Sequence, residues 1–101
     1  MSLFKNYVFD FGSIKAGSIN VASFPYDTLN PADIVSLTAG CGCSSPVKKS
    51  DSVQVSYNSD GHSGNIHKFV TVTLDDKKYP GYNENGTPKN VVKLELKASI
   101  E

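Results

Sequence analysis

The residues best suited to chemistry in this sequence are two cysteines and two histidines. Cys41 and Cys43 flank a single glycine, and His62 and His67 follow later in the chain. Two thiolates and two imidazoles would complete the tetrahedral shell of a zinc ion, but structural zinc sites usually place two or more residues between paired cysteines. The spacing therefore favours a tight glycine-rich loop, with small thiols packed against the fold, over a metal site.

The same two cysteines also limit the disulfide chemistry of the chain. Because Cys41 and Cys43 are so close in sequence, they cannot link distant parts of the fold. A bridge across one residue is possible but strained, since bridged Cα atoms prefer a separation of roughly 4.4 to 6.8 Å. No basic residue or helix N-terminus is obviously placed to lower a thiolate pKa. Metal or redox binding by the loop that holds Cys41 and Cys43 is the alternative functional hypothesis.

A hydrolytic site is suggested only superficially by Asp60, His62 and Ser63. Neighbouring residues in a turn point in divergent directions, so closeness in sequence does not assemble a catalytic triad. We therefore predict no catalytic residues, no metal or cofactor site and no enzyme activity.

Length and charge exclude several broader classes. The chain has 101 residues and a mass of 10.9 kDa, which fits one domain over residues 1–101. Ten lysines balance ten acidic residues and arginine is absent, so nucleic acid is not an expected partner. No apolar stretch has the length of a signal peptide or a membrane span. We expect no membrane insertion and no export signal, and a location in the cytoplasm or in a virion.

A period of two in hydropathy marks the second half of the chain. Apolar residues occupy alternate positions in the segments 53–57, 66–74 and 92–100, as in strands that bury one face. Lys68 and Phe69 are exceptions to this phase, so Lys68 must reach water and Phe69 should be half exposed. Residues 58–64 are rich in turn formers and predict a hairpin between the first two of these strands.

The first half of the chain predicts three further strands, near residues 7–11, 22–26 and 34–39. Pro25 cannot donate a ladder hydrogen bond, so its strand should lie at a sheet edge or contain a bulge. Residues 40–46 are expected to form a loop. The segment from Asp75 to Asn90 is expected to form a long loop with exposed tyrosines at 79 and 82, and such loops are usually binding elements or mobile excursions.

Six or seven short strands separated by turns in a chain of this length predict an all-β fold. The spacing is typical of an immunoglobulin-like β-sandwich of about seven strands, and no segment requires a helix.

The order of several motifs resembles a known family. The opening segment 9–17, the Phe-Pro-Tyr strand at 24–26, the Cys-Gly-Cys-Ser loop at 41–44 and the alternating segment 64–72 are similar to the hydin-like bacterial family of unknown function that carries a Cys-Gly-Cys-Thr loop. This resemblance implies an immunoglobulin-like domain that scaffolds or interacts without catalysis. Family members are commonly exported and often lipid-anchored. Because this chain shows neither signal nor lipobox cysteine, that location is not implied for it.

These observations predict a non-catalytic structural or interaction module. The expected partners are proteins of a larger assembly, such as the capsid or tail of a virion that the module decorates. Lys93, Glu95 and Lys97 are expected to guard one outer face, while Thr71 and Thr73, with Phe69 between the layers, are expected to leave another face free for docking.

Overall fold

Seven β-strands and a single 3-10 turn, Pro31–Asp33, make up the regular structure of the described residues. The computed structural model describes residues 3–40 and 43–101. The strands are β1 (Val8–Ile14), β2 (Ile19–Pro25), β3 (Ile34–Ala39), β4 (Ser44–Lys48), β5 (Ser52–Asn58), β6 (Gly64–Leu74) and β7 (Val91–Ile100). The predicted all-β class is confirmed. No helix in the described part of the chain is long and apolar enough to cross a membrane.

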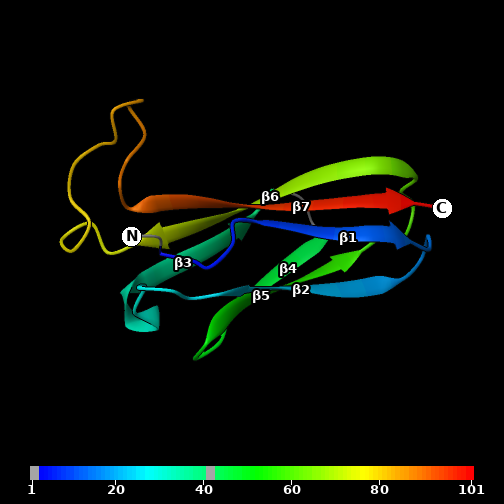
Figure 1. Ribbon diagram of the computed structural model, residues 1–101, viewed down its shortest axis with the longest axis horizontal. Coiled ribbons are helices and arrows are strands. Elements are labelled where there is room, and N and C mark those ends of the chain that lie inside the picture. Colours follow the sequence, from blue (N-terminus) through cyan, green and yellow to red (C-terminus); the bar gives the residue numbers. More distant parts are fainter. Residues whose placement is uncertain (1–2, 41–42) are drawn as a thin grey trace.

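The strands form two sheets that pack face to face (Figure 1). One sheet has the order β1-β7-β6-β3 and the other the order β2-β5-β4. β1 runs parallel to β7, and every other pairing is antiparallel. The neighbours β7-β6-β3 and β2-β5-β4 correspond to strands G-F-C and B-E-D of an immunoglobulin domain, with β1 added beside the last strand. The predicted immunoglobulin-like sandwich of about seven strands is therefore confirmed.

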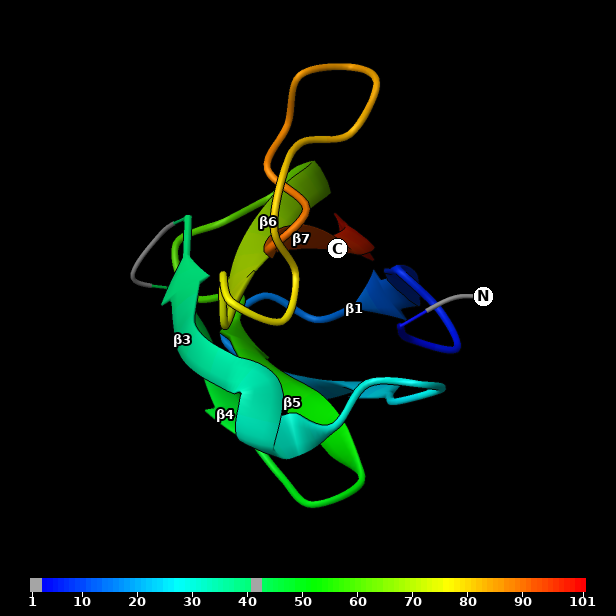
Figure 2. The same ribbon diagram turned by 90° about the vertical axis from the view of Figure 1, so that its left-hand side faces the viewer.

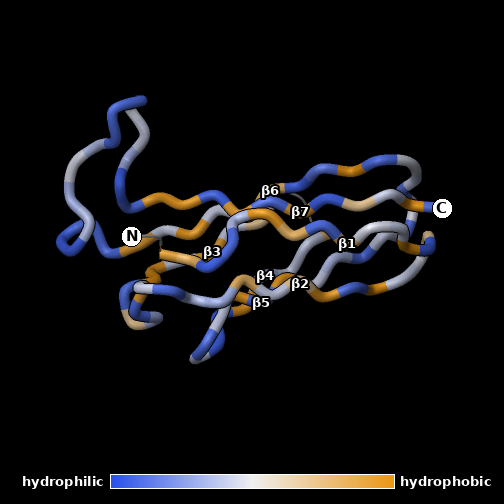
Figure 3. Tube along the Cα trace, viewed as in Figure 1, coloured by the Kyte–Doolittle hydropathy of each residue, from blue (hydrophilic) through white to orange (hydrophobic). Residues whose placement is uncertain are grey.

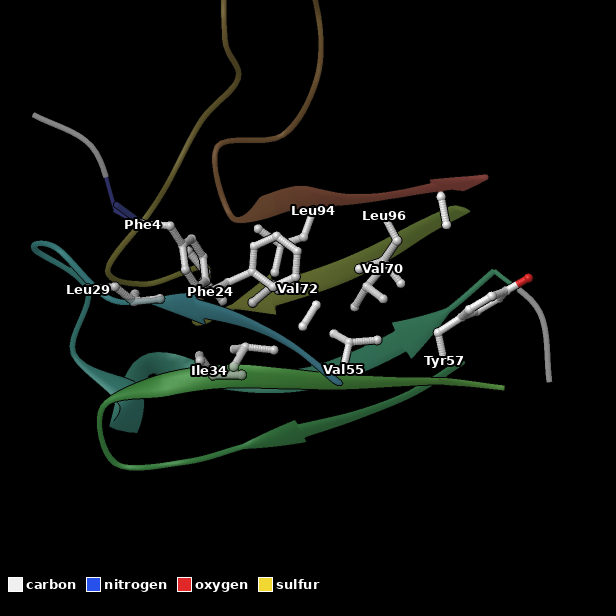
Figure 4. Close-up of a cluster of buried hydrophobic side chains, with 14 of the residues drawn as sticks. Phe4, Phe24, Leu29, Ile34, Val55, Tyr57, Val70, Val72, Leu94 and Leu96 are labelled. Carbon is white, nitrogen blue, oxygen red and sulfur yellow. The ribbon is translucent and has the colours of Figure 1, made fainter. Parts of the chain in front are cut away.

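The core is built by the period-two alternation read from the sequence. In β7, Leu94, Leu96, Ala98 and Ile100 are buried. Residues from the neighbouring strand β6 lie beside them, and residues from β2 and β5 meet them from across the sandwich (Figure 4). Full burial of each large aliphatic or aromatic side chain stabilises the fold by about 1.5–3 kcal/mol before entropy is counted. Within residues 3–40 and 43–101, the buried apolar residues are Phe4, Ile14, Ala22, Phe24, Leu29, Ile34, Val53, Val55, Tyr57, Val70, Val72, Leu74, Leu94, Leu96, Ala98 and Ile100.

The predicted hairpin between the strands that flank residues 58–64 is wrong. β5 pairs with β2 and β4, whereas β6 pairs with β3 and β7, so this segment crosses from one sheet to the other. The buried Ser59 anchors the crossover, because its hydroxyl donates to the carbonyl of Lys15 at 2.7 Å and accepts from the amide of Ser18 at 3.0 Å. Turn-forming residues indicated where the chain reverses, but they did not encode which sheet receives it.

The predicted loop at 40–46 also needs correction, because Ser44 to Pro46 belong to β4. Residues 41 and 42 of this segment lie outside the described residues. The amide of Asn58 donates to the carbonyl of Cys43 at 2.9 Å, which starts the pairing of β4 with β5. Backbone groups of successive residues alternate between the two sides of a strand, so the Pro46 nitrogen faces the open side of this edge strand. A proline is tolerated there, since no ladder donor is needed.

Pro25 lies, as predicted, on an edge strand, because β2 ends the three-stranded sheet. The two exceptions in β6 also behave as expected: Lys68 is partly buried and Phe69 is 39% exposed.

Candidate functional site

The cysteines and histidines do not assemble into a metal site in the described part of the chain. Cys43 is disulfide-bonded, so its sulfur is not a thiolate that could bind a metal, and Cys41 lies outside the described residues. The Nδ1 atom of His62 is hydrogen-bonded to the buried Tyr57 hydroxyl, whereas Nε2 of His67 lies 3.3 Å from the Glu95 carboxylate. Within residues 3–40 and 43–101, no group of three or more His, Cys, Asp or Glu residues could hold a metal ion.

The acid, imidazole and hydroxyl at positions 60, 62 and 63 do not form a triad. The ring of His62 stacks on Tyr57, with 5.7 Å between centroids, and its backbone amide donates to the carbonyl of Ser59. Among the described residues, no hydrogen bond joins His62 to Asp60 or Ser63. The imidazole is therefore held by a core tyrosine, and no nucleophile is positioned beside it.

Three tyrosines give a direct test of the packing. Burial raises the pKa of Tyr26, Tyr57 and Tyr79 above the ordinary value of 10.0, with nearby carboxylates at Asp51 and Asp33 adding to the effect for Tyr26 and Tyr79. The folded state therefore favours the neutral phenols. We expect the stabilisation that these neutral phenols contribute to be present in full below about pH 10. It should be lost as the pH rises through the raised pKa values of the folded state. Titration of phenolate absorbance, folded and in denaturant, checks this expectation, and coincident curves would contradict it.

The outer face of the four-stranded sheet is charged. Because β6 pairs with β7, Thr71 lies opposite Lys93 and Phe69 lies opposite Glu95. The expectation of a guarded face and a separate docking face is thus wrong, since both sets of side chains share one surface. Lys93 Nζ lies 5.8 Å from the centre of the Phe69 ring, so the ammonium group covers this aromatic side chain. A mixed-charge surface of this kind is well solvated.

A depression of about 420 Å³ opens on the same face beside β1. It lies where the register of β1 against β7 shifts between Asp10 and Ser13. Asp10, His67 and Lys97, from three adjacent strands, contribute the charged or ionisable groups of its lining. The His67 side chain is 47% exposed, so solvent screens its contact with the Glu95 carboxylate. None of the buried polar residues of the described chain lines the depression, so it offers no desolvated group for catalysis.

The outer face of the three-stranded sheet has the opposite character, and we call it the uncharged face. Its exposed aliphatic side chains are Ile19 at 69%, Val21 at 54% and Val47 at 47%. The register of β2 and β4 on β5 places small or amide side chains between them, and no charged residue occupies an outward strand position. The uncharged face comprises Ile19, Val21, Ser23, Ser45, Val47, Gln54, Ser56 and Asn58.

The loop from residue 75 to residue 90 projects from one end of the sandwich (Figure 2), and its colours in Figure 3 range from hydrophilic to intermediate. A buried carboxylate fixes its base: Asp33 Oδ1 lies 3.1 Å from Lys78 Nζ, and Asp33 Oδ2 accepts from the Tyr79 hydroxyl at 3.3 Å. Tyr79 is partly buried against the core, which corrects the prediction of an exposed side chain, whereas Tyr82 is 70% exposed as predicted. The predicted long loop is thus present, with an ordered attachment to the body.

Sequence reasoning missed the uncharged face. The signal was present in β2, where Ile19 and Val21 are apolar on the phase opposite to the buried Ala22 and Phe24. A strand that is apolar on both phases indicates that its outer face also has a use.

Comparison of the chain with family models, with curated proteins and with solved structures found no match in any of the three. The resemblance to the hydin-like family therefore depends on the motifs in residues 9–72 alone and stays a prediction.

Proposed function

We propose that this protein is a non-catalytic interaction module that attaches to a larger assembly through its uncharged face. The observation that carries the proposal is the contrast between the two outer faces. One presents lysines, acids and a histidine beside the exposed Val8 and Phe69, and the other presents three exposed aliphatic side chains among serines and amides, with no charge at an outward strand position.

The physical reason is the cost of removing charges from water. A docked partner buries the surface that it covers, and a charged group without a partner there opposes binding strongly. Interface cores are correspondingly depleted in charged residues. The uncharged face avoids this cost. Burial of its aliphatic side chains at positions 19, 21 and 47 favours binding by about 25 cal/mol for each Å² of apolar surface removed from water.

The setting that we propose is a virion, where the module decorates capsid or tail proteins. A small sandwich whose depression beside β1 has its ionisable groups on a solvated face suits structural attachment better than catalysis. The hydin-like resemblance, which implies scaffolding, points the same way.

The test replaces one exposed aliphatic side chain of the uncharged face with a charged one. We expect purified particles to contain the chain in a fixed copy number, and Val47→Lys to weaken its attachment at least about tenfold, because the lysine would be buried without a partner. Quantitative mass spectrometry of the particles measures the copy number. Val35→Lys is the matched control, since Val35 is 67% exposed on β3 of the other sheet.

Two results would overturn parts of the proposal. If Val47→Lys and Val35→Lys retain the same copy number as the parent chain, the uncharged face is not the docking surface. If purified particles lack the chain, the virion setting is wrong. Far-ultraviolet circular dichroism of each variant shows that the sandwich is intact before either conclusion is drawn.

A further inference from the structure

The free side of β2 offers unpaired backbone groups. The amide of Tyr26 donates to Asp51 beside β5 at 3.1 Å, whereas the carbonyl of Pro25 accepts from the amide of Lys5 on the opposite side at 2.9 Å. Because backbone direction alternates along a strand, the amides and carbonyls of Ile19, Val21 and Ser23 also face that opposite side. No other segment among the described residues forms a backbone hydrogen bond with them.

The other three sheet edges carry features that discourage strand addition. β1 contains Asp10 and an irregular register before Ser13, and β3 has a register shift between Ile34 and Ser36. β4 has five residues that include a proline and a lysine. Charges, bulges, prolines and short length are the means by which proteins protect exposed edges.

β2 lacks these protections over most of its length. It pairs with β5 at seven consecutive positions without a register shift, and its sequence contains no charged residue. Only Pro25, at its last position, interrupts the edge, and Lys5 already occupies the carbonyl there. The open portion is therefore limited to Ile19–Ser23, which is long enough to pair with another short strand.

We propose that β2 pairs antiparallel with β2 of a second copy of this chain, across a twofold axis at Val21. Ile19 would then lie opposite Ser23 of the partner, and Val21 opposite its own counterpart, so every outward amide meets an outward carbonyl. A shift in register would bring Pro25 or the turn at Gly17 into the pairing and leave outward backbone amides without an acceptor. The symmetry is closed, so each chain gains one partner and assembly stops at the dimer.

Electrostatics favour a second copy as the occupant. Symmetric pairing places identical residues close together, which penalises any edge that carries a charge. At β2 it brings together only Ile19, Val21 and Ser23, and no like charges meet. The two uncharged faces would become one continuous surface. The inference goes beyond the proposed function and does not require it, because pairing uses the strand edge and docking uses the face.

Sedimentation equilibrium over a concentration series tests the dimer. A single strand edge buries little area, so we expect a weak, concentration-dependent dimer of the parent chain. Val21→Lys should lower the association constant at least about tenfold, because two ammonium groups would face each other across the axis. Val47→Lys, on the same face but on β4, should leave association unchanged. Monomer at every soluble concentration of the parent chain would overturn the proposal.

A charge exchange tests the register. An equimolar mixture of Val21→Lys and Val21→Glu should recover association that neither variant shows alone, since position 21 lies opposite position 21 only in the proposed pairing. Amide hydrogen exchange gives a second readout: the amides of Ile19, Val21 and Ser23 should become protected as concentration rises. Failure of the mixture to associate, or equal protection at all concentrations, would overturn the pairing. Both results are independent of how Val47→Lys affects attachment to particles, so the two proposals can fail separately.

Discussion

Replacing Phe24 with alanine is expected to lower the free energy of unfolding by about 3–5 kcal/mol. Phe24 is fully buried between the sheets, where its ring lies 6.3 Å from the ring of Phe9 and its backbone pairs with Val53. The substitution removes a large apolar surface and leaves a cavity that two paired sheets cannot easily close. Domains of this size have about 5–15 kcal/mol of stability in total, so the substitution removes a large fraction of it. Urea denaturation followed by circular dichroism measures the change.

Phe69→Ala is the matched control for this substitution. Phe69 is 39% exposed on the outer face of β6, where it contacts His67 and lies under Lys93. We expect its loss to cost less than about 1 kcal/mol, the size of an exposed cation–π contact or a surface substitution. Equal losses for the two variants would contradict the division of these residues between core and surface.

The parts of the fold that the sequence predicted are those that local alternation determines. Apolar residues on every second position from Val92 to Ile100 are sufficient to identify β7 and its buried face, because side chains of a strand must alternate. The same reasoning located β5 and the buried half of β6. The alternation therefore identifies the buried and exposed faces of a strand without knowledge of which strands lie beside it.

The parts that could not be predicted depend on which strands become neighbours. Residues 58–64 have the composition of a hairpin, yet the chain passes to the other sheet, and Ser59 holds the start of this crossover against Lys15 and Ser18. β4 was hidden by Pro46, which is compatible with a strand only because that strand lies at an edge. Neither the crossover nor the edge position of β4 can be inferred from the residues next to them in the sequence.

The candidate docking surface was missed for the same reason. Val47 becomes part of an uncharged face only when β4 is placed beside β5 and β5 beside β2, which brings it to the same surface as Ile19 and Val21. Conversely, Phe69 was assigned to a free face because its pairing with Glu95 was unknown. The available signal was that both the inward and the outward positions of β2 hold apolar residues. This pattern suggests that the outer surface of β2 contacts another molecule, but it does not show how far that surface extends.

Asp33→Ala is expected to lower the free energy of unfolding by about 1–3 kcal/mol, the cost of leaving a buried polar group without its partner. The Asp33 carboxylate is buried, and it accepts a hydrogen bond from the partly buried Tyr79 hydroxyl. Truncation leaves that hydroxyl without its acceptor. Asp33→Asn keeps an acceptor oxygen and should recover part of the loss, whereas Asp76→Ala, at an exposed position of the same loop, should be nearly neutral.

The larger consequence of Asp33→Ala is expected in the loop from residue 75 to residue 90. Its base is held to the body by the ion pair of Lys78 with Asp33, by the Tyr79 hydroxyl and by the Asp75 amide, which donates to the Asp33 carbonyl at 2.8 Å. Of these three contacts, only the backbone hydrogen bond survives the substitution. Amide hydrogen exchange should therefore become faster across residues 75–90 while the amides of β7 change only by the global loss of stability. Lys78→Ala should change exchange little, since that side chain is 60% exposed and its ion pair is screened. If Lys78→Ala loosens the loop as much as Asp33→Ala does, the ion pair and not the tyrosine contact holds it.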